Sequence, residues 1–303
     1  MEPEKIPQLM SITSVACGRY FTICLDSGGY VWGFGANGYG QLGLGDTNIR
    51  KEPQQNETLP HIISVACGFN HTVCIDTTSR VWSFGCGDSG QLGHGSPYDK
   101  ATPTLIPDFN NIQSAACGEL HTLFLTDNGD VYGAGSCEYG QLGLVNCKGV
   151  MVPTKISSVS NISSIACGSS HSIVLNFEGK AFTLGNACNG YPGKSDPAPI
   201  NVNAIIRTIS CGYYHSILLD EDGAVWVFGQ NGKAQLGTVD NVQEVAIPQK
   251  LNIPDLNPVS FVSQGGEHTI IKEEGGDIIV FGENSKGQLG TSRQERLGVL
   301  GPT

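Results

Sequence analysis

Histidine and cysteine recur in this sequence at regular positions, and both side chains can bind metal ions, while histidine can also carry protons. The pattern is Cys-Gly-x-x-His, and it includes His71, His121, His171, His215 and His268 together with Cys17, Cys67, Cys117, Cys167 and Cys211. The first copy has Phe21 in place of histidine, which cannot ligate a metal, and the last has Gln264 in place of cysteine. We therefore interpret both sets as structural, with each imidazole donating a hydrogen bond to a loop carbonyl and each thiol buried as a small apolar group.

Two glycine motifs resemble nucleotide-binding sequences without the context that such sites need. Gly-x-Gly-x-x-Gly occurs at 33–38 and at 85–90, but another turn motif follows each copy where a nucleotide site requires a helix. Gly193-Lys194-Ser195 resembles the end of a phosphate-binding loop, yet Cys188 stands at the required upstream glycine position. No nucleophile, base and acid form a recognisable set. We expect no cofactor, no metal ion, no catalytic residues and no enzymatic chemistry.

The cysteine pattern marks an internal repeat that covers nearly the whole chain. The five pattern cysteines are 50, 50, 50 and 44 residues apart, and a sixth copy follows 53 residues later at Gln264. Each unit continues with a short apolar run, a polar turn, an aromatic run that ends in glycine, and a Gly-Gln-Leu-Gly motif or a variant of it. The units are approximately 5–53, 54–103, 104–153, 154–199, 200–248 and 249–303. A repeat of this length indicates a propeller or a solenoid.

The segments within each unit are typical of β-strands. Short runs rich in Val, Ile, Trp, Phe and Thr alternate with turns, and Asn128-Gly129 and Asp222-Gly223 are typical of tight hairpins. Each unit provides about four such strands, and no stretch shows the period of an amphipathic helix. The sequence therefore predicts an all-β protein, a β-propeller of six four-stranded blades in a single domain over residues 1–303, whose ring protects the sheet edges.

Composition limits the classes of partner. Lys and Arg number 17 and Asp and Glu number 28, which gives a net charge of −11, and no run of four basic residues exists. Direct binding to nucleic acid is not expected, because phosphate contacts need clustered cations. No apolar run reaches the ~18 residues of a membrane-spanning helix. The N-terminus lacks the basic-then-apolar layout of a signal peptide, so we expect a cytoplasmic or nuclear protein with reduced cysteines.

The combination of Cys-Gly-x-x-His, a Val-x-x-x-Gly aromatic run such as 81–85, and Gly-Gln-Leu-Gly resembles the regulator of chromosome condensation repeat family. The likeness extends over all six units, roughly residues 5 to 295. Founding members of that family form seven-bladed propellers, whereas this chain has six recognisable units. A six-bladed ring is favoured, and the alternative is a seven-bladed ring with an incomplete blade.

The resemblance also implies an activity, because founding members catalyse guanine-nucleotide exchange on Ran-like small GTPases. Matched position by position, Glu119, Glu267 and His268 are the residues that would carry exchange here. Two departures weaken this reading: the family uses Asp at the acidic positions, and no unit contains a long insertion that could act as a wedge against a GTPase.

The two variable positions of Cys-Gly-x-x-His, which we call the variable pairs, are the candidate binding residues. They hold aromatic, charged and amide side chains that are common in interfaces, and such loops gather on one face of a propeller. The candidates are Arg19, Tyr20, Phe69, Asn70, Glu119, Tyr213, Tyr214 and Glu267, together with His268. The sequence thus predicts a monomeric propeller that binds a protein partner through this face. The alternative function is exchange on a Ran-like small GTPase.

Overall fold

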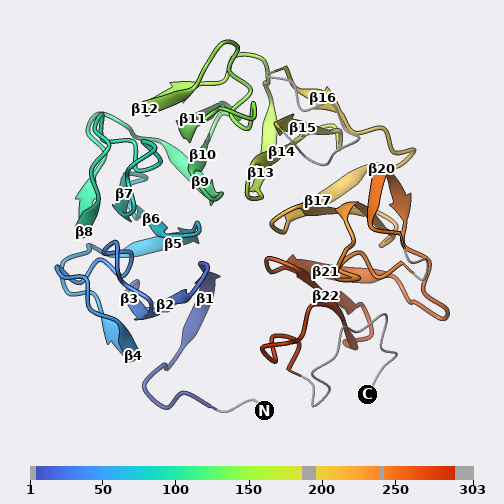
Figure 1. Ribbon diagram of the computed structural model, residues 1–303, viewed down its shortest axis with the longest axis horizontal. Helices are drawn as coiled ribbons and strands as arrows, with labels where there is room; N and C mark the ends of the chain where they lie inside the picture. The colour runs from blue at the N-terminus through green and yellow to red at the C-terminus, as the bar shows by residue number, and fades with distance from the viewer. Residues whose placement is uncertain (1–4, 186–195, 239–241, 291–303) are drawn as a thin grey trace.

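The computed structural model describes residues 5–185, 196–238 and 242–290. Within these ranges the chain is all-β, and its 23 strands form six antiparallel sheets arranged around a common axis (Figure 1). The same ranges contain no helix, and therefore no helix that could cross a membrane. The six-bladed propeller predicted from the repeat is confirmed.

Each blade runs outward from the axis in chain order, so that its first strand is innermost. The first three blades each have four strands. Blade 1 contains β1 (Ile12–Cys17), β2 (Phe21–Asp26), β3 (Val31–Gly35) and β4 (Arg50–Gln55). Blade 2 contains β5 (Ile62–Cys67), β6 (His71–Asp76), β7 (Val81–Gly85) and β8 (Lys100–Leu105). Blade 3 contains β9 (Ile112–Cys117), β10 (His121–Thr126), β11 (Val131–Ser136) and β12 (Gly149–Lys155).

The last three blades repeat this order, but the outer strand is very short in blade 4 and absent among the described residues of blade 6. Blade 4 contains β13 (Ile162–Cys167), β14 (His171–Asn176), β15 (Ala181–Gly185) and β16, which has only two residues (Ala198–Pro199). Blade 5 contains β17 (Ile206–Cys211), β18 (His215–Asp220), β19 (Val225–Gln230) and β20 (Glu244–Lys250). Blade 6 has three strands among the described residues, β21 (Val259–Gln264), β22 (His268–Glu273) and β23 (Ile278–Gly282), whereas the sequence predicted four.

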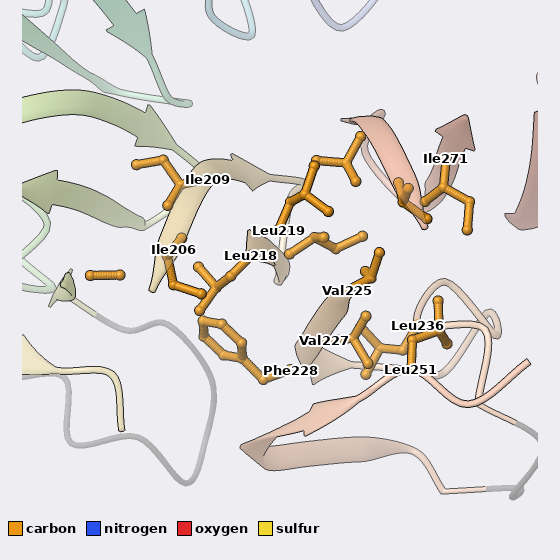
Figure 2. Packing of buried hydrophobic residues seen from close by; sticks show 14 of the residues in the cluster. Ile206, Ile209, Leu218, Leu219, Val225, Val227, Phe228, Leu236, Leu251 and Ile271 are labelled. Carbon is orange, nitrogen blue, oxygen red and sulfur yellow. The ribbon is translucent and has the colours of Figure 1, made fainter. Parts of the chain in front are cut away.

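Most of the core lies between blades rather than within them. We call the side of a blade that faces the following blade its forward face, and the opposite side its rear face. Ile23 and Leu25 lie on the forward face of blade 1 and pack in one cluster with Ile62, Cys74 and Phe84 on blade 2. A larger cluster joins blades 4, 5 and 6, and Figure 2 shows its centre, where residues of blade 5 approach Ile271 of blade 6. Alternate residues of the second strand thus pack against different blades, which explains why β6, β10 and β18 are buried on both faces.

The hairpin turn between the second and third strands is closed by a recurring tryptophan–aspartate contact. Trp82 Nε1 donates to Asp76 Oδ2 at 3.0 Å, and the same bond joins Trp32 to Asp26 and Trp226 to Asp220. The turn itself needs a left-handed residue, which Gly129 and Gly223 provide with φ of 80° and 79°. The hairpins expected at these two glycines are therefore confirmed, and Trp82 and Trp226 also pack against the hydrophobic clusters between blades.

Asp76→Ala is expected to lower the free energy of unfolding by about 2 kcal/mol, because the buried carboxylate accepts hydrogen bonds that would be left unmade. Burial raises the pKa of Asp76, but bonds from Thr78, Trp82 and the Arg80 backbone outweigh it and lower that pKa to about 2. The stabilisation is therefore present above the unfolded pKa of about 3.9 and is lost as the pH falls toward 2. Urea unfolding at pH 7 tests the loss, with the exposed Asp127→Ala as control, and equal stabilities of the two variants would contradict it.

Candidate functional site

The loops that follow the innermost strands form one end of the central channel, and the Cys-Gly motif shapes each of them. In every blade the glycine N–H donates to the backbone carbonyl of the residue in the histidine position, as in Gly118 N to His121 O at 2.8 Å. The imidazole then lies directly against the glycine, where a Cβ would overlap the ring. Glycine is therefore required for steric reasons, and the two residues between it and the histidine project from a tight loop.

Backbone hydrogen bonds link these loops from blade to blade. In each of five junctions, the N–H of the first residue of a variable pair donates to a carbonyl on the next blade. The bonds are Arg19 N to Phe69 O (3.2 Å), Phe69 N to Gly118 O (3.2 Å), Glu119 N to Ser169 O (3.3 Å), Ser169 N to Tyr213 O (2.9 Å) and Tyr213 N to Gly266 O (2.9 Å). This chain of bonds places all six variable pairs around the same end of the channel, which we call the channel mouth.

Three side chains from different blades meet across the channel mouth. The rings of Phe69 on blade 2 and Tyr213 on blade 5 pack with their centroids 4.4 Å apart. The Arg19 guanidinium lies 5.6 Å from the Phe69 centroid and 5.3 Å from that of Tyr20, which are cation–π distances. We call Arg19, Phe69 and Tyr213 the mouth stack. A cavity of about 330 Å³ is lined by these three residues, by Gly266 and His268, and by the Cys-Gly dipeptides.

The remaining candidates surround the mouth stack or lie beside it. Tyr20 and Tyr214 are exposed, at 70% and 39%, and Tyr214 packs edge-on against Tyr213. Glu119 is half-buried and accepts a hydrogen bond from the hydroxyl of Ser169, a residue of the next variable pair that sequence reasoning did not single out. Asn70 and Glu267 are half-buried, and each backbone carbonyl accepts from the N–H of the residue that directly follows the third strand of the same blade.

The centre of the channel mouth contains both positive and negative side chains, and they act on the pKa of the half-buried Tyr213 in opposite directions. Burial raises the pKa of Tyr213, and the charge of Arg19 partly opposes this, while Tyr20, Glu119 and Glu267 add to the increase. The mouth thus combines one cation with two carboxylates around aromatic rings. Such a surface suits contacts with a polypeptide, whose charged and aromatic side chains it can match.

The pattern histidines join neighbouring blades through a hydroxyl group instead of the loop carbonyl predicted from the sequence. His121 Nε2 lies 2.9 Å from Ser172 Oγ on blade 4, and that hydroxyl donates back to the Gln141 carbonyl on blade 3 at 2.8 Å. Because the hydroxyl proton is used there, the imidazole must donate its Nε2–H. The same arrangement joins His71 to Thr122, which donates to the Gln91 carbonyl, while His171 and His215 contact Ser216 and Thr269. The signal for this contact is the Thr or Ser that follows the histidine position in every unit.

These histidines are neutral at physiological pH. Burial lowers the pKa of His71 and His171 to about 4, and it lowers that of His121 and His215 to about 3, with neighbouring histidines adding to the effect at the latter two. Their Nδ1 atoms have no hydrogen-bond partner in the described part of the chain. No group of three or more metal-ligating side chains occurs there either. His268 differs, because it is only partly buried.

The pattern cysteines are poorly reactive, with one exception. Burial raises the pKa of the Cys67 and Cys117 thiols well above the usual range, whereas Cys17 on blade 1 is exposed. The expectation that all cysteines are reduced is not met, because Cys137 and Cys147 form a disulfide across the loop between β11 and β12. Their Cα atoms lie 5.7 Å apart, a separation that a disulfide spans readily.

Comparisons with known proteins match this architecture. The chain aligns with the crystal structure of human WBSCR16 at 27% identity and a TM-score of 0.84, covering 94% of this chain and 79% of that one. It aligns with Prp20p from Saccharomyces cerevisiae at 23% identity and a TM-score of 0.82, covering 94% and 75%. A segment of 56 residues is 45% identical to the probable E3 ubiquitin-protein ligase HERC4 of Mus musculus, but it spans only 18% of this chain and 5% of that protein.

Two family models account for nearly all of the six blades. A regulator of chromosome condensation (RCC1) repeat matches residues 12–41, which form most of blade 1. An RCC1-like domain matches residues 49–301, from the outer strand of blade 1 onward. That second match alone covers more than half of the sequence, and therefore the chain belongs to the RCC1-like domain family.

Proposed function

We propose that this protein is an interaction module that binds a partner protein at the channel mouth and performs no covalent chemistry of its own. The observation that carries the proposal is the mouth stack, in which side chains from blades 1, 2 and 5 meet beside the exposed Tyr20 and Tyr214. Aromatic residues and arginine provide most of the binding energy in protein interfaces. A rigid platform under them reduces the entropy that is lost when a partner binds.

The scaffold residues support a role without catalysis. The buried histidines join blades and stay neutral, and the cysteines around the cavity are mostly desolvated, so neither set supplies an acid, a base or a nucleophile. The side chains left to act are those of the variable pairs, which differ from blade to blade. Because these side chains differ between blades that otherwise share one structure, the surface they form can be specific for one partner.

A second candidate function is guanine-nucleotide exchange on a Ran-like small GTPase. Prp20p, which has the same fold, has been studied for its binding to Gsp1p and histones, and it has also been crystallised with Kap60. Glu119 and Glu267 lie at the channel mouth in this chain. An exchange factor displaces the nucleotide through its contacts with the GTPase and needs no covalent chemistry, so carboxylates at a binding surface could take part. Release of a fluorescent GDP analogue from a purified Ran-like GTPase is the direct measurement, and acceleration that Glu119→Ala and Glu267→Ala abolish would place this function first.

Replacing Tyr20 and Tyr214 together by Ala is expected to weaken partner binding about 30-fold or more, because loss of even one ring that anchors an interface costs ~2 kcal/mol. Both rings are exposed, so the fold should be unaffected. Proteins captured by the wild type are identified by mass spectrometry, and the affinity of the strongest is then measured for each variant. Tyr98→Ala is the matched control, because Tyr98 is 70% exposed like Tyr20 but lies outside the variable pairs. Equal binding by the wild type and the double variant would show that another surface is used.

A further inference from the structure

The loop between the third and the outer strand is closed by a side-chain amide in blades 1 and 5. In blade 1, Asn37 is the second residue after the glycine of the Val-x-x-x-Gly run, and its Nδ2 donates to the Asp46 carbonyl at 2.9 Å. Its Oδ1 accepts from the Leu42 N–H at 2.9 Å. Asn231 makes both kinds of bond at the equivalent position of blade 5, to residues of its own loop. The amide thus ties the outer half of the loop to the end of the third strand.

Blade 3 has Cys137 at this position, and its disulfide with Cys147 spans the same part of the loop. The two cysteines are 10 residues apart, while Asn37 and the carbonyl that it reaches are 9 residues apart and the corresponding groups of Asn231 are 11 apart. A covalent bond therefore stands where blades 1 and 5 have a hydrogen bond. Reduction breaks this closure, whereas it leaves an amide hydrogen bond unchanged.

The outer half of this loop, residues 144–148, has few other contacts that would hold it, and we call it the latch segment. Within the described ranges, its one hydrogen bond to the rest of the protein runs from the Cys137 N–H to the Lys148 carbonyl at 3.2 Å. Val145 is 62% exposed, and Leu144 provides an apolar contact with the cluster between blades 3 and 4. The disulfide is therefore the strongest attachment of the latch segment to its blade.

We propose that the Cys137–Cys147 disulfide is a redox-operated latch, and that thiol–disulfide exchange with a dithiol reductant releases the latch segment from the blade. A thiolate of the reductant attacks the sulfur of Cys147, which is only partly buried, and the Cys137 sulfur leaves and takes up a proton. The second thiol of the reductant then displaces the Cys147 sulfur, which takes up the other proton. Two electrons have then passed to the protein, and the reductant has become a disulfide. Thiols are weak hydrogen-bonding groups, so they do not replace the closure that Asn37 gives.

The rest of the loop stays anchored when the latch opens, so the change is confined to the latch segment. Leu142 is completely buried, and the Gln141 carbonyl accepts from the Ser172 hydroxyl of blade 4 at 2.8 Å. Ser136, which ends the third strand, donates its N–H to the Leu120 carbonyl in the variable pair of blade 3 at 2.8 Å. The latch thus lies beside the channel mouth, but its opening does not depend on the proposed function, because no partner takes part in it.

Limited proteolysis of the full chain by trypsin tests the latch, because Lys148 is exposed at the end of the latch segment. Cleavage after Lys148 is expected to accelerate about tenfold or more when excess dithiothreitol is added, since a protease cuts a segment in proportion to how often it opens. Cleavage after Lys155 in β12 is the internal reference and should keep its rate. Equal rates for oxidised and reduced protein would overturn the proposal. Equal acceleration at both lysines would also overturn it, because it would indicate general unfolding.

Two variants separate the latch from other effects of the reductant. Cys137→Asn supplies the residue that blades 1 and 5 use, so cleavage after Lys148 should stay slow with and without dithiothreitol. Cys147→Ser removes the disulfide without that replacement, so cleavage should be fast under both conditions. Acceleration by dithiothreitol in either variant, or slow cleavage of Cys147→Ser, would overturn the proposal. Alkylation of the unfolded, air-oxidised protein should leave Cys137 and Cys147 unlabelled, and labelling of both would contradict the latch, because there would be no disulfide to open.

Discussion

Acidification from pH 7 to pH 5 is expected to reduce the free energy of unfolding by several kcal/mol, on a scale comparable with the total stability of a typical domain. His71, His121, His171 and His215 are fully buried, and burial is the main cause that holds their pKa values at about 3 to 4. In the unfolded chain the same side chains take up protons below pH ~6.5. The unfolded state therefore binds more protons between these values, and stability falls as the pH falls.

The size of the effect follows from the number of histidines. Each costs about 1.4 kcal/mol per pH unit below ~6.5, so four together reach on the order of 5–8 kcal/mol at pH 5. Urea unfolding at pH 7.5, 6 and 5 measures the slope directly. His121→Phe should lower the slope by about one quarter, since Phe21 shows that this position accepts an aromatic ring without a titrating group. Stability that stays constant from pH 7 to pH 5 would mean that the imidazoles are protonated within the folded protein.

Gly135→Ala is expected to destabilise the protein by more than ~3 kcal/mol. Gly135 is the penultimate residue of β11, the third strand of blade 3, and its φ is 104°, a conformation that side-chain-bearing residues rarely adopt. A Cβ at this position would overlap the Leu120 carbonyl oxygen and would also approach the His121 backbone, which pairs with Gly135. Neither contact involves a flexible side chain, so relief requires movement of the backbone beside the channel mouth.

Gly38→Ala provides the matched control for this effect. Gly38 lies in a loop where a new Cβ would meet nothing within 4 Å, so the expected change is within ~0.5 kcal/mol. Thermal and urea unfolding of both variants gives the comparison. Similar stabilities for the two variants would contradict the prediction, because they would show that the space around Gly135 does not require glycine.

Much of the fold could be predicted from the sequence because the same pattern of strands and turns occurs in all six repeat units. A single Gly-x-Gly-x-x-Gly or a single histidine permits several interpretations, whereas Cys-Gly-x-x-His at a regular spacing assigns these residues to the scaffold. The variable pairs could be placed at one end of the channel for the same reason, since equivalent loops in a propeller occupy equivalent places. Their binding role stays a prediction, because a repeat specifies position and carries no information about the partner.

Contacts between blades were the part that the sequence could not supply in detail. The imidazole of His121 reaches the hydroxyl of Ser172, which lies 51 residues further along the chain, and the Cys137–Cys147 disulfide closes a loop without any recognisable motif. Phe69 and Tyr213 pack across the channel, although 144 residues separate them (213 − 69). Such pairs depend on how far the blades rotate about the axis and on how long each side chain is, and neither quantity is encoded locally.

The sequence by itself determined the all-β class and the propeller architecture and favoured six blades, because strand periodicity and glycine-dependent turns are local properties repeated in every unit. Only the tertiary structure decided which faces are covered. Ile270 and Val73 are similar in type and stand at equivalent positions in their units, yet Val73 is 1% exposed and Ile270 is partly exposed. The difference arises because burial depends on whether another blade lies alongside, and that is a property of the assembled ring.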